Sequence, residues 1–471
     1  MTFLRVQVGT AIHLKWIDDH KDQMISDLEE LININSVEAE ALPDAPFGQG
    51  PKDALLKFLD FGKRDGFSTE NLQNYAGDIE FGKGEESIGI IAHVDVVPAG
   101  SGWDSDPFKM ENDGVYLTGR GTQDDKGPGI AAYYAMRAIK ETGVPIKRVI
   151  RLILGTNEET NWGGINYYVK NKKMPTMGFT PDAEFPVIFG EKGIVTGTLS
   201  LSVDLKNSAV KTFKAGNAPN MVPDYAEIVL DKSKINLNVL SNLVGALSYK
   251  ENGSEVVISA NGKSAHGSTP EAGENAISIL LKSIEGVFMA GDEFIKFLEF
   301  YNTKLGFTFH GEGLGVDFED EKSGKLNFNI GMIEKFEDKI NLVLNMRFPL
   351  TGVTKEDIKT QIEKSTIDFN GSFKQTGGEN PLYIDPESKL IKILMDAYQN
   401  QSGDMESKPM VIGGGTYAKA MDNCVAFGAM FKDDEDRMHQ KNERIKIERL
   451  MDSAKIYAEA LYTLATEEKV L

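Results

Sequence analysis

The chain has 471 residues, of which 41% are hydrophobic and 26% are charged, a composition typical of globular domains rather than of disordered or membrane proteins. Its 71 acidic residues outnumber 51 basic ones, and the formal net charge of −20 disfavours nucleic acid and anionic lipid as partners. The single cysteine, Cys424, cannot form an internal disulfide, and no apolar run resembles a signal peptide or the ~18-residue core of a membrane span. We therefore expect a soluble cytoplasmic protein.

The first part of the chain alternates helical and strand patterns. In chain order, we predict a helix over 15–31, a helix over 52–62, a strand over 88–97, a helix over 129–143, a strand over 148–156 and a helix over 161–171. Strands that alternate with helices at this spacing are typical of βαβ units on a mixed or parallel sheet.

The pattern changes after Gly193. Period-two alternation predicts half-exposed strands, and helical patterns lie between them; the strands are expected over 194–205, 225–230, 254–260 and 340–350, and the helices over 274–288 and 354–365. A buried α/β pattern returns from about Asp385 and ends with a helix over 449–468. We therefore predict an α/β protein in which residues 1–192 and 385–471 form one mixed-sheet domain and residues 193–384 form an inserted α+β domain.

Acidic residues and histidines gather where predicted strands give way to loops. The relevant stretches are "IIAHVDVV" with His93 and Asp95, "GRGTQDDKG" with Asp124 and Asp125, "LGTNEETNW" with Glu158 and Glu159, "TPDAEFP" with Asp182 and Glu184, "GKSAHGSTP" with His266, and "DRMHQKNE" with His439. On an extended strand, His93 and Asp95 would point to the same face. Each stretch alone also fits a structural pair, a solvated surface or a turn.

Together these stretches indicate a metal site. Ligands of open α/β sheets bind beyond the carboxyl ends of the strands, and several carboxylates that meet there would repel one another strongly. One or two divalent cations remove that repulsion, and imidazole nitrogen and carboxylate oxygen are both ligands of zinc. Two cations that lie ~3.5–4 Å apart need a shared carboxylate and two flanking sets of ligands.

The motifs "HVDVVPAG.GW..DPFKM", "GRG..DDKGP", "LGTNEETNW", "PDAE.P", "IGGGTY" and "MH..NE" resemble those of the dizinc aminoacylase, carboxypeptidase and dipeptidase family of metallopeptidases. The chain is most similar to the PepV-type bacterial dipeptidases, from about Lys15 to the C-terminus. The resemblance implies a two-domain metallopeptidase whose inserted domain is a lid. It implies a hydrolase that cleaves the peptide bond of unblocked dipeptides, Xaa-Xaa or β-Ala-Xaa, with two zinc ions per subunit.

The resemblance also implies the metal ligands. His93 and Asp182 are expected to bind one zinc, Glu159 and His439 the other, and Asp124 to bridge the two. Manganese or cobalt could occupy the same oxygen-rich site. In the local patterns, Gln123 stands where relatives often carry a small residue.

Catalytic roles follow from the same resemblance. Glu158 is expected to be the general base that takes a proton from the metal-activated water and passes it to the leaving amine. Asp95 is expected to accept the ring N–H of His93 and so fix its tautomer. Family members hold the peptide bond after the bridging aspartate in cis, which here is the Asp124–Asp125 bond.

Substrate contacts are implied mainly in the lid. His266 is expected to donate to the tetrahedral oxyanion, Arg347 to pair with the substrate carboxylate as an arginine fork does, and Asn220 to contact the substrate. The amides of a glycine turn between a strand and a helix are the further candidates for holding a carboxylate, namely Gly413, Gly414, Gly415 and Thr416. An ordinary glycine turn explains that stretch equally well.

Two alternatives remain open. An N-acyl-amino-acid deacylase or a carboxypeptidase would use the same scaffold, the same zinc ions and Glu158, but would not need a free substrate amine. A non-catalytic peptide- or zinc-binding protein would be expected to lack the base or the bridging residue, and both are present here. Because the lid is long enough to supply the oxyanion histidine within one chain, we expect a monomer.

Overall fold

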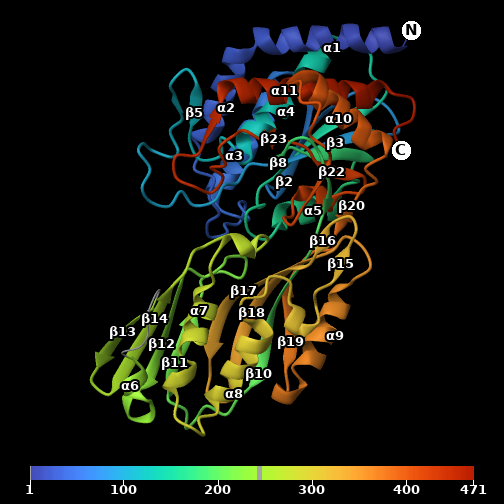
Figure 1. Ribbon diagram of the computed structural model, residues 1–471. Helices are drawn as coiled ribbons and strands as arrows, with labels where there is room; N and C mark the ends of the chain where they lie inside the picture. Colours follow the sequence, from blue (N-terminus) through green and yellow to red (C-terminus); the bar gives the residue numbers. More distant parts are fainter. Residues whose placement is uncertain (1, 241–246) are drawn as a thin grey trace. The chain divides into compact units, whose positions relative to one another are not determined.

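The computed structural model describes residues 2–240 and 247–471 and divides into two compact units (Figure 1). Unit 1 comprises Met1–Phe189, Ile384–Met410 and Thr416–Leu471, and unit 2 comprises Gly190–Tyr383 and Val411–Gly415. The predicted boundaries at 193 and 384 lie close to these limits. The division differs from the prediction at Val411–Gly415, which was expected to belong to the same domain as the rest of the C-terminal segment.

Unit 1 is built on a mixed sheet with strand order β1-β2-β6-β3-β7-β22-β9. Its strands are β1 (Ser68–Leu72), β2 (Ala76–Phe81), β3 (Ser87–His93), β6 (Val149–Gly155), β7 (Met177–Thr180), β9 (Ile188–Glu191) and β22 (Cys424–Ala426). Strand β3 runs parallel to both β6 and β7, and β22 runs parallel to β7, whereas β1, β2 and β6 pair antiparallel. The predicted α/β class with a mixed sheet is therefore confirmed.

Helices accompany this sheet, and one of them, α4, is buried along most of its length. The helices of unit 1 are α1 (Thr2–Asp19), α2 (Lys21–Ile32), α3 (Gln49–Arg64), α4 (Lys126–Glu141), α5 (Gly163–Asn171), α10 (Lys389–Ser402) and α11 (Ile447–Thr466). Helix α4 contacts β3 and β6 as well as α1, α2 and α11, and its residues from Lys126 to Ile139 are all buried. A helix that is packed on every side needs the nearly uniform apolar composition of "GIAAYYAMRAI".

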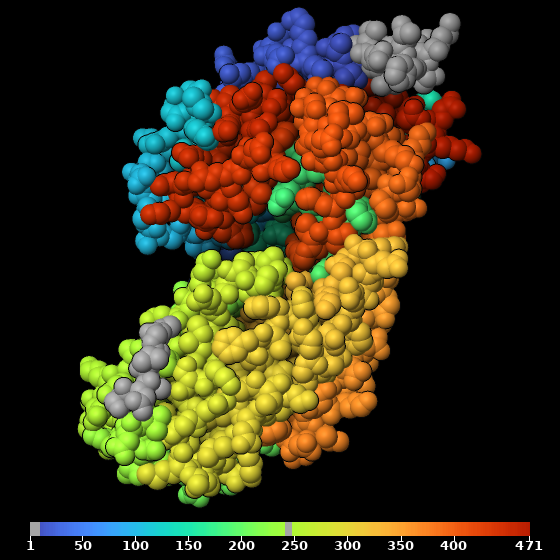
Figure 2. All heavy atoms as spheres, viewed as in Figure 1, coloured from blue at the N-terminus to red at the C-terminus, as the bar shows by residue number. Residues whose placement is uncertain are grey.

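Short strands complete unit 1. They are β4 (Glu111–Asn112), β5 (Tyr116–Thr118) and β24 (Arg444–Lys446), which form one small sheet, and β8 (Ala183–Glu184) with β23 (Ala429–Met430), which form another. In β5 and β24, Thr118 pairs with Arg444, so that residues near 118 lie beside the C-terminal segment. Figure 2 shows this neighbourhood on the surface of unit 1, with residues around 100–118 in cyan against the red C-terminal segment.

One predicted helix of unit 1 is interrupted, and one predicted strand ends earlier than expected. The helix predicted over 15–31 is divided between α1 and α2 at His20, where the His20 ring donates from Nδ1 to the carbonyl of Trp16 at 2.7 Å and its backbone N–H bonds to Ile17 instead. The strand predicted over 88–97 stops at His93, because Val96 pairs only as an isolated bridge with Val37. The expectation that His93 and Asp95 share one strand face is therefore wrong.

Unit 2 is an α+β unit built on an eight-stranded antiparallel sheet with order β13-β14-β12-β11-β17-β18-β10-β19. Its strands are β10 (Gly193–Ser202), β11 (Val210–Ala215), β12 (Tyr225–Asp231), β13 (Leu247–Asn252), β14 (Glu255–Asn261), β17 (Asn327–Lys335), β18 (Lys339–Phe348) and β19 (Ser372–Gly377). Residues of β10 are alternately buried and half-buried, as the period-two pattern of its sequence predicts.

Helices α6 (Leu237–Leu240), α7 (Ala276–Ser283), α8 (Phe294–Phe300) and α9 (Lys355–Ser365) belong to unit 2. Among the remaining short strands, β15 (Glu319–Asp320) pairs with β16 (Gly324–Lys325), whereas β20 (Leu382–Tyr383) and β21 (Met410–Ile412) both pair with β9. Helix α7 packs on β12 and β14, and side chains of α7, α8 and α9 join the sheet in a second hydrophobic core. Across 2–240 and 247–471, none of the helices combines the length and the apolar composition needed to cross a bilayer.

A buried histidine ties α1 to α11. The His13 ring packs edge-to-face on Tyr462, with 4.7 Å between the ring centroids, and neither of its nitrogens has a hydrogen-bond partner among the described residues. Burial lowers the pKa of His13 from 6.5 to about 4. The folded state therefore binds this proton less readily than the unfolded chain does.

This histidine should make stability fall in mild acid. Because the pKa is about 4 in the folded state and 6.5 in the unfolded chain, protonation favours the unfolded state as the pH falls through that range. Between pH 7 and pH 5, wild-type protein should lose about 2 kcal/mol of unfolding free energy relative to His13→Leu. Urea unfolding of both proteins at each pH measures this difference, and an equal loss in both would contradict it.

Candidate metal centre

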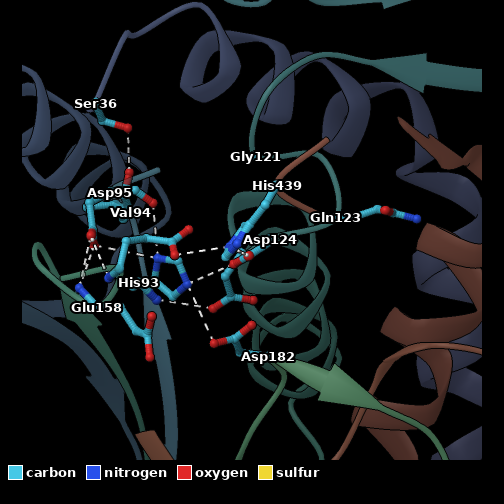
Figure 3. A network of polar contacts seen from close by, with 12 residues as sticks. Ser36, His93, Val94, Asp95, Gly121, Gln123, Asp124, Glu158, Asp182 and His439 are labelled. Carbon is cyan, nitrogen blue, oxygen red and sulfur yellow. Dashed lines mark hydrogen bonds and ion pairs between the residues drawn. The ribbon is translucent and has the colours of Figure 1, made fainter. Parts of the chain in front are cut away.

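The predicted metal ligands of unit 1 converge beyond the carboxyl ends of three neighbouring parallel strands. His93 is the last residue of β3, and its register partner Gly155 ends β6 just before Glu158 and Glu159. Asp182 follows β7 by two residues. The end-to-end alignment of these strands therefore brings together residues that lie far apart in the sequence (Figure 3).

Asp124 lies between two histidines. Its Oδ1 is 3.0 Å from Nε2 of His93, and its Oδ2 is 2.9 Å from Nε2 of His439. Asp182 Oδ2 lies 3.6 Å from the His93 nitrogen, and Glu159 Oε2 lies 3.1 Å from the His439 nitrogen. The arrangement has the form of two ligand sets that share one carboxylate.

The donor set fits divalent cations. Potential ligand atoms of His93, Asp124 and Glu159 lie within 4.8 Å of one another, as do those of His93, Glu158 and Asp182. Among the described residues, His93 Nε2, Asp124 Oδ1 and Glu159 Oε1 are buried and have no aligned hydrogen-bond partner, although the first two face each other at 3.0 Å. Buried polar atoms without partners are costly, and a cation would satisfy all three.

The pKa values of Glu158, Glu159 and His439 are all raised, which shows that the cluster favours bound positive charge. Burial raises the pKa of Glu158 well above its usual range, with neighbouring carboxylates adding to the effect and His93 opposing it. Burial and the charge of Asp124 raise the pKa of Glu159 to about 7. Hydrogen bonds to Asp124 and Glu159 raise the pKa of His439 to about 11. Without a cation, these groups retain protons that a metal would displace.

Asp95 accepts the ring N–H of His93 through its backbone carbonyl rather than through its carboxylate. Its backbone carbonyl, at 3.0 Å, accepts the Nδ1–H of His93, whereas its carboxylate Oδ1 lies 3.5 Å from that nitrogen. The carboxylate instead accepts the backbone N–H groups of Glu158, at 2.9 and 3.1 Å, and of Glu159, at 3.2 Å. Asp95 thus places a proton on Nδ1 of His93, which leaves Nε2 as the ligand atom, and it anchors the turn that carries the two glutamates.

Two further features concern the expected base and bridge. Trp162 donates from its indole Nε1 to Oε1 of Glu158 at 3.1 Å. Trp162 lies in the "LGTNEETNW" motif, four residues after Glu158, and this spacing was the available signal for its role. The Asp124–Asp125 peptide bond is cis, as expected, and Asp125 Oδ2 accepts the backbone N–H of His93 at 3.1 Å.

The expected substrate-binding residues of unit 2 also lie together. The N–H of Gly267, next to His266, donates to the Asn220 carbonyl at 2.7 Å. A Cβ atom on Gly413 would lie 3.0 Å from Cβ of Ser268, two residues after His266. Arg347 donates from Nη1 to the Gly413 carbonyl at 3.1 Å, and its burial lowers its pKa to about 10.

Thr416 belongs to unit 1, apart from the glycines that precede it in the chain. Its Oγ1 accepts the backbone N–H of Ala418 at 3.2 Å and caps a 3-10 turn, Tyr417–Ala420, where a helix was expected. The N-terminal dipole of a longer helix, one reason to expect a carboxylate near Gly413–Thr416, is therefore lacking at this turn.

Known proteins resemble this chain along most of its length. The sequence model of peptidase family M20/M25/M40 matches residues 89–463. A Staphylococcus epidermidis protein named as a candidate dipeptidase is 40% identical over 467 residues, covering 96% of this chain and 98% of the relative. A protein of Staphylococcus aureus strain USA300 with the same designation is 40% identical over 468 residues, covering 96% and 99%.

Solved structures share the fold at lower identity. Human carnosine dipeptidase 1 superposes with a TM-score of 0.59 at 16% identity, covering 97% of this chain and 98% of that one. Aminoacylhistidine dipeptidase from Vibrio alginolyticus gives a TM-score of 0.58 at 16% identity, covering 95% and 97%.

Proposed function

Because the chain belongs to peptidase family M20/M25/M40, we propose that it is a dinuclear zinc dipeptidase that hydrolyses the peptide bond of unblocked dipeptides. The observation that carries this proposal is the position of Asp124, whose two carboxylate oxygens each face a histidine nitrogen. His93 and Asp182 would hold one cation, and Glu159 and His439 the other. Bound cations would supply Lewis acidity for the scissile carbonyl and the attacking water.

Glu158 is the proposed general base. Its carboxylate lies within the cluster, near His93 and Asp182, and would take a proton from the attacking water and later deliver it to the leaving amine. Trp162 holds one oxygen of this carboxylate, and Asp95 holds the backbone N–H of Glu158. These two contacts support a base whose orientation is set before the substrate arrives.

Unit 2 would supply the substrate contacts. The His266 ring accepts at Nδ1 from the backbone N–H of Ser268, at 3.2 Å, so a neutral ring carries its proton on Nε2. That proton is the donor that a developing oxyanion requires. Arg347 is proposed to pair with the C-terminal carboxylate of the substrate and Asn220 to contact its backbone, while Gly413, Gly414, Gly415 and Thr416 are proposed to offer backbone amides.

Assembly and location follow as further proposals. The inserted segment, Gly190–Tyr383, is long enough for His266 to serve the site of its own chain, which supports a monomer. The single cysteine supports a cytoplasmic enzyme.

A small substrate panel tests the proposed function. Because a free amine is part of the proposed substrate, N-acetylation of a dipeptide should lower kcat/KM by about 100-fold or more. Chelation of the metal should abolish the activity, and added zinc should restore it. Steady-state rates on free and N-acetylated dipeptides, with and without chelator, give the answer. Faster cleavage of the acetylated form would instead indicate an N-acyl-amino-acid deacylase or a carboxypeptidase.

A further inference from the structure

His439 is presented by an irregular loop rather than by a helix or strand. It lies between β23 and β24, its φ of 61° is in the left-handed region, and its side chain is 55% exposed. A left-handed conformation costs roughly 1–2 kcal/mol for a residue other than glycine. Something must therefore hold this loop where the ring meets Asp124 and Glu159.

Gln123 holds the loop on the N-terminal side of His439. Its Oε1 accepts the backbone N–H of Arg437 at 2.9 Å, and its Nε2 donates to the Glu435 carbonyl at 2.9 Å. One side-chain amide thus satisfies two backbone groups that lie two residues apart, as a neighbouring strand would. Figure 3 shows the Gln123 side chain pointing away from His93, whereas its neighbour Asp124 points toward the histidines.

Glu443 holds the loop on the C-terminal side. Its Oε1 accepts the backbone N–H groups of Gly121, Gln123 and Asp124 at 3.1, 2.8 and 3.2 Å, and its Oε2 accepts from Arg120 at 2.6 Å. The side chain is fully buried. Glu443 is four residues after His439 and is the last residue of the "MH..NE" motif.

We propose that Gln123 and Glu443 are positioning residues that lock the His439 loop onto the Asp124 loop. Gln123 thereby sets the affinity of the cation position formed by Asp124, Glu159 and His439, and Glu443 sets the affinity of both cation positions. This inference rests on the proposed function only in requiring that the centre binds two cations. Neither side chain needs to touch a cation, because both act through the backbone of the two loops.

The two contacts should differ in what they control. Both hydrogen bonds of Gln123 reach only residues 435–437, so their loss should affect His439 and leave His93 and Asp182, which stand at strand ends, in place. Glu443 also holds the backbone of Asp124, which faces both histidines. Its loss should therefore weaken both cation positions.

Zinc titration of metal-free protein separates these roles without any substrate. For Gln123→Ala, we expect the zinc affinity of the position that contains His439 to fall by ~10–100-fold. The affinity of the position that contains His93 and Asp182 should stay within about threefold of wild type. At saturating zinc, kcat should recover. Gln440→Ala is the matched control, because Gln440 lies in the same loop but is exposed, and its side chain bonds only within that loop, from Nε2 to the Asp436 carbonyl at 3.1 Å. Its two affinities should equal those of wild type.

The outcomes are distinct. Equal weakening of both positions in Gln123→Ala, or no weakening, would overturn the selective role of Gln123. Glu443→Gln should weaken both positions, and wild-type affinities in that variant would overturn the role of Glu443. A wild-type protein that binds two zinc ions yet cleaves no dipeptide would contradict the proposed function alone, whereas a wild-type protein that binds none would contradict both.

Discussion

Replacing Glu158 by glutamine should lower kcat by about 10³–10⁴-fold while zinc content stays at the wild-type level. The amide has the same shape as the carboxylate but cannot take a proton from water, and a positioned general base contributes up to about 10⁴-fold. The metal ligands in the proposed scheme, among them Asp124 and His93, are untouched. Steady-state kinetics on a dipeptide, together with metal analysis of the same preparation, measures both quantities.

A variant of Trp162 distinguishes the loss of the base itself from the loss of the hydrogen bond that orients it. Trp162→Phe keeps an aromatic ring but removes the N–H that reaches Oε1 of Glu158, so it should cost about 10-fold in kcat, in line with one hydrogen bond to a charged group. If Glu158→Gln kept activity near that of wild type, Glu158 would not be the base. If it lost zinc together with activity, Glu158 would act as a ligand.

Replacing His266 by alanine should lower kcat by about 10²–10³-fold, the effect of losing one oxyanion donor. Substrate affinity should change much less, because the donor acts on charge that develops only in the transition state. The zinc content should not change, since every proposed metal ligand belongs to unit 1. Measuring kcat and KM separately shows the difference.

Ser268→Ala provides the control for His266. The Ser268 hydroxyl lies 2.6 Å from Nδ1 of the ring, and its backbone N–H also bonds that nitrogen, so the backbone contact survives the substitution. We expect a loss of kcat of about 10-fold or less. An unchanged kcat in His266→Ala would place that histidine outside the active site.

Much of the fold follows from periodicity. The alternation along β10 and the uniform apolar composition of α4 both predicted their elements, because burial on one face or on all faces leaves a direct mark in the sequence. Element ends were less predictable. The end of α1 depends on the His20 side chain bonding the Trp16 carbonyl, and no periodic pattern records such a bond.

In the candidate site, too, some features were predictable from the sequence and others were not. Strand ends and residue types pointed to the stretches that contain His93, Glu158, Glu159 and Asp182, because parallel strands meet at one edge. The family resemblance divided these residues into metal ligands and a base. The partners of Asp95 were not predictable: "IIAHVDVV" reads as continuous strand, whereas the chain leaves the sheet after His93 and directs the carboxylate to the backbone of the next turn. Contacts from a side chain to a distant backbone, such as those of Glu443, leave no local pattern.

The place of β22 in the sheet has a consequence for the synthesis of the protein. This strand comes from the last segment of the chain, yet it pairs with β7 and β9, which are made before unit 2. During synthesis of the inserted unit, the edge of β7 that later pairs with β22 is therefore unpaired. An unpaired strand edge of this kind favours aggregation. Nascent chains that stall before Cys424 should depend on chaperones, and His439 can join the metal centre only when the chain is nearly complete.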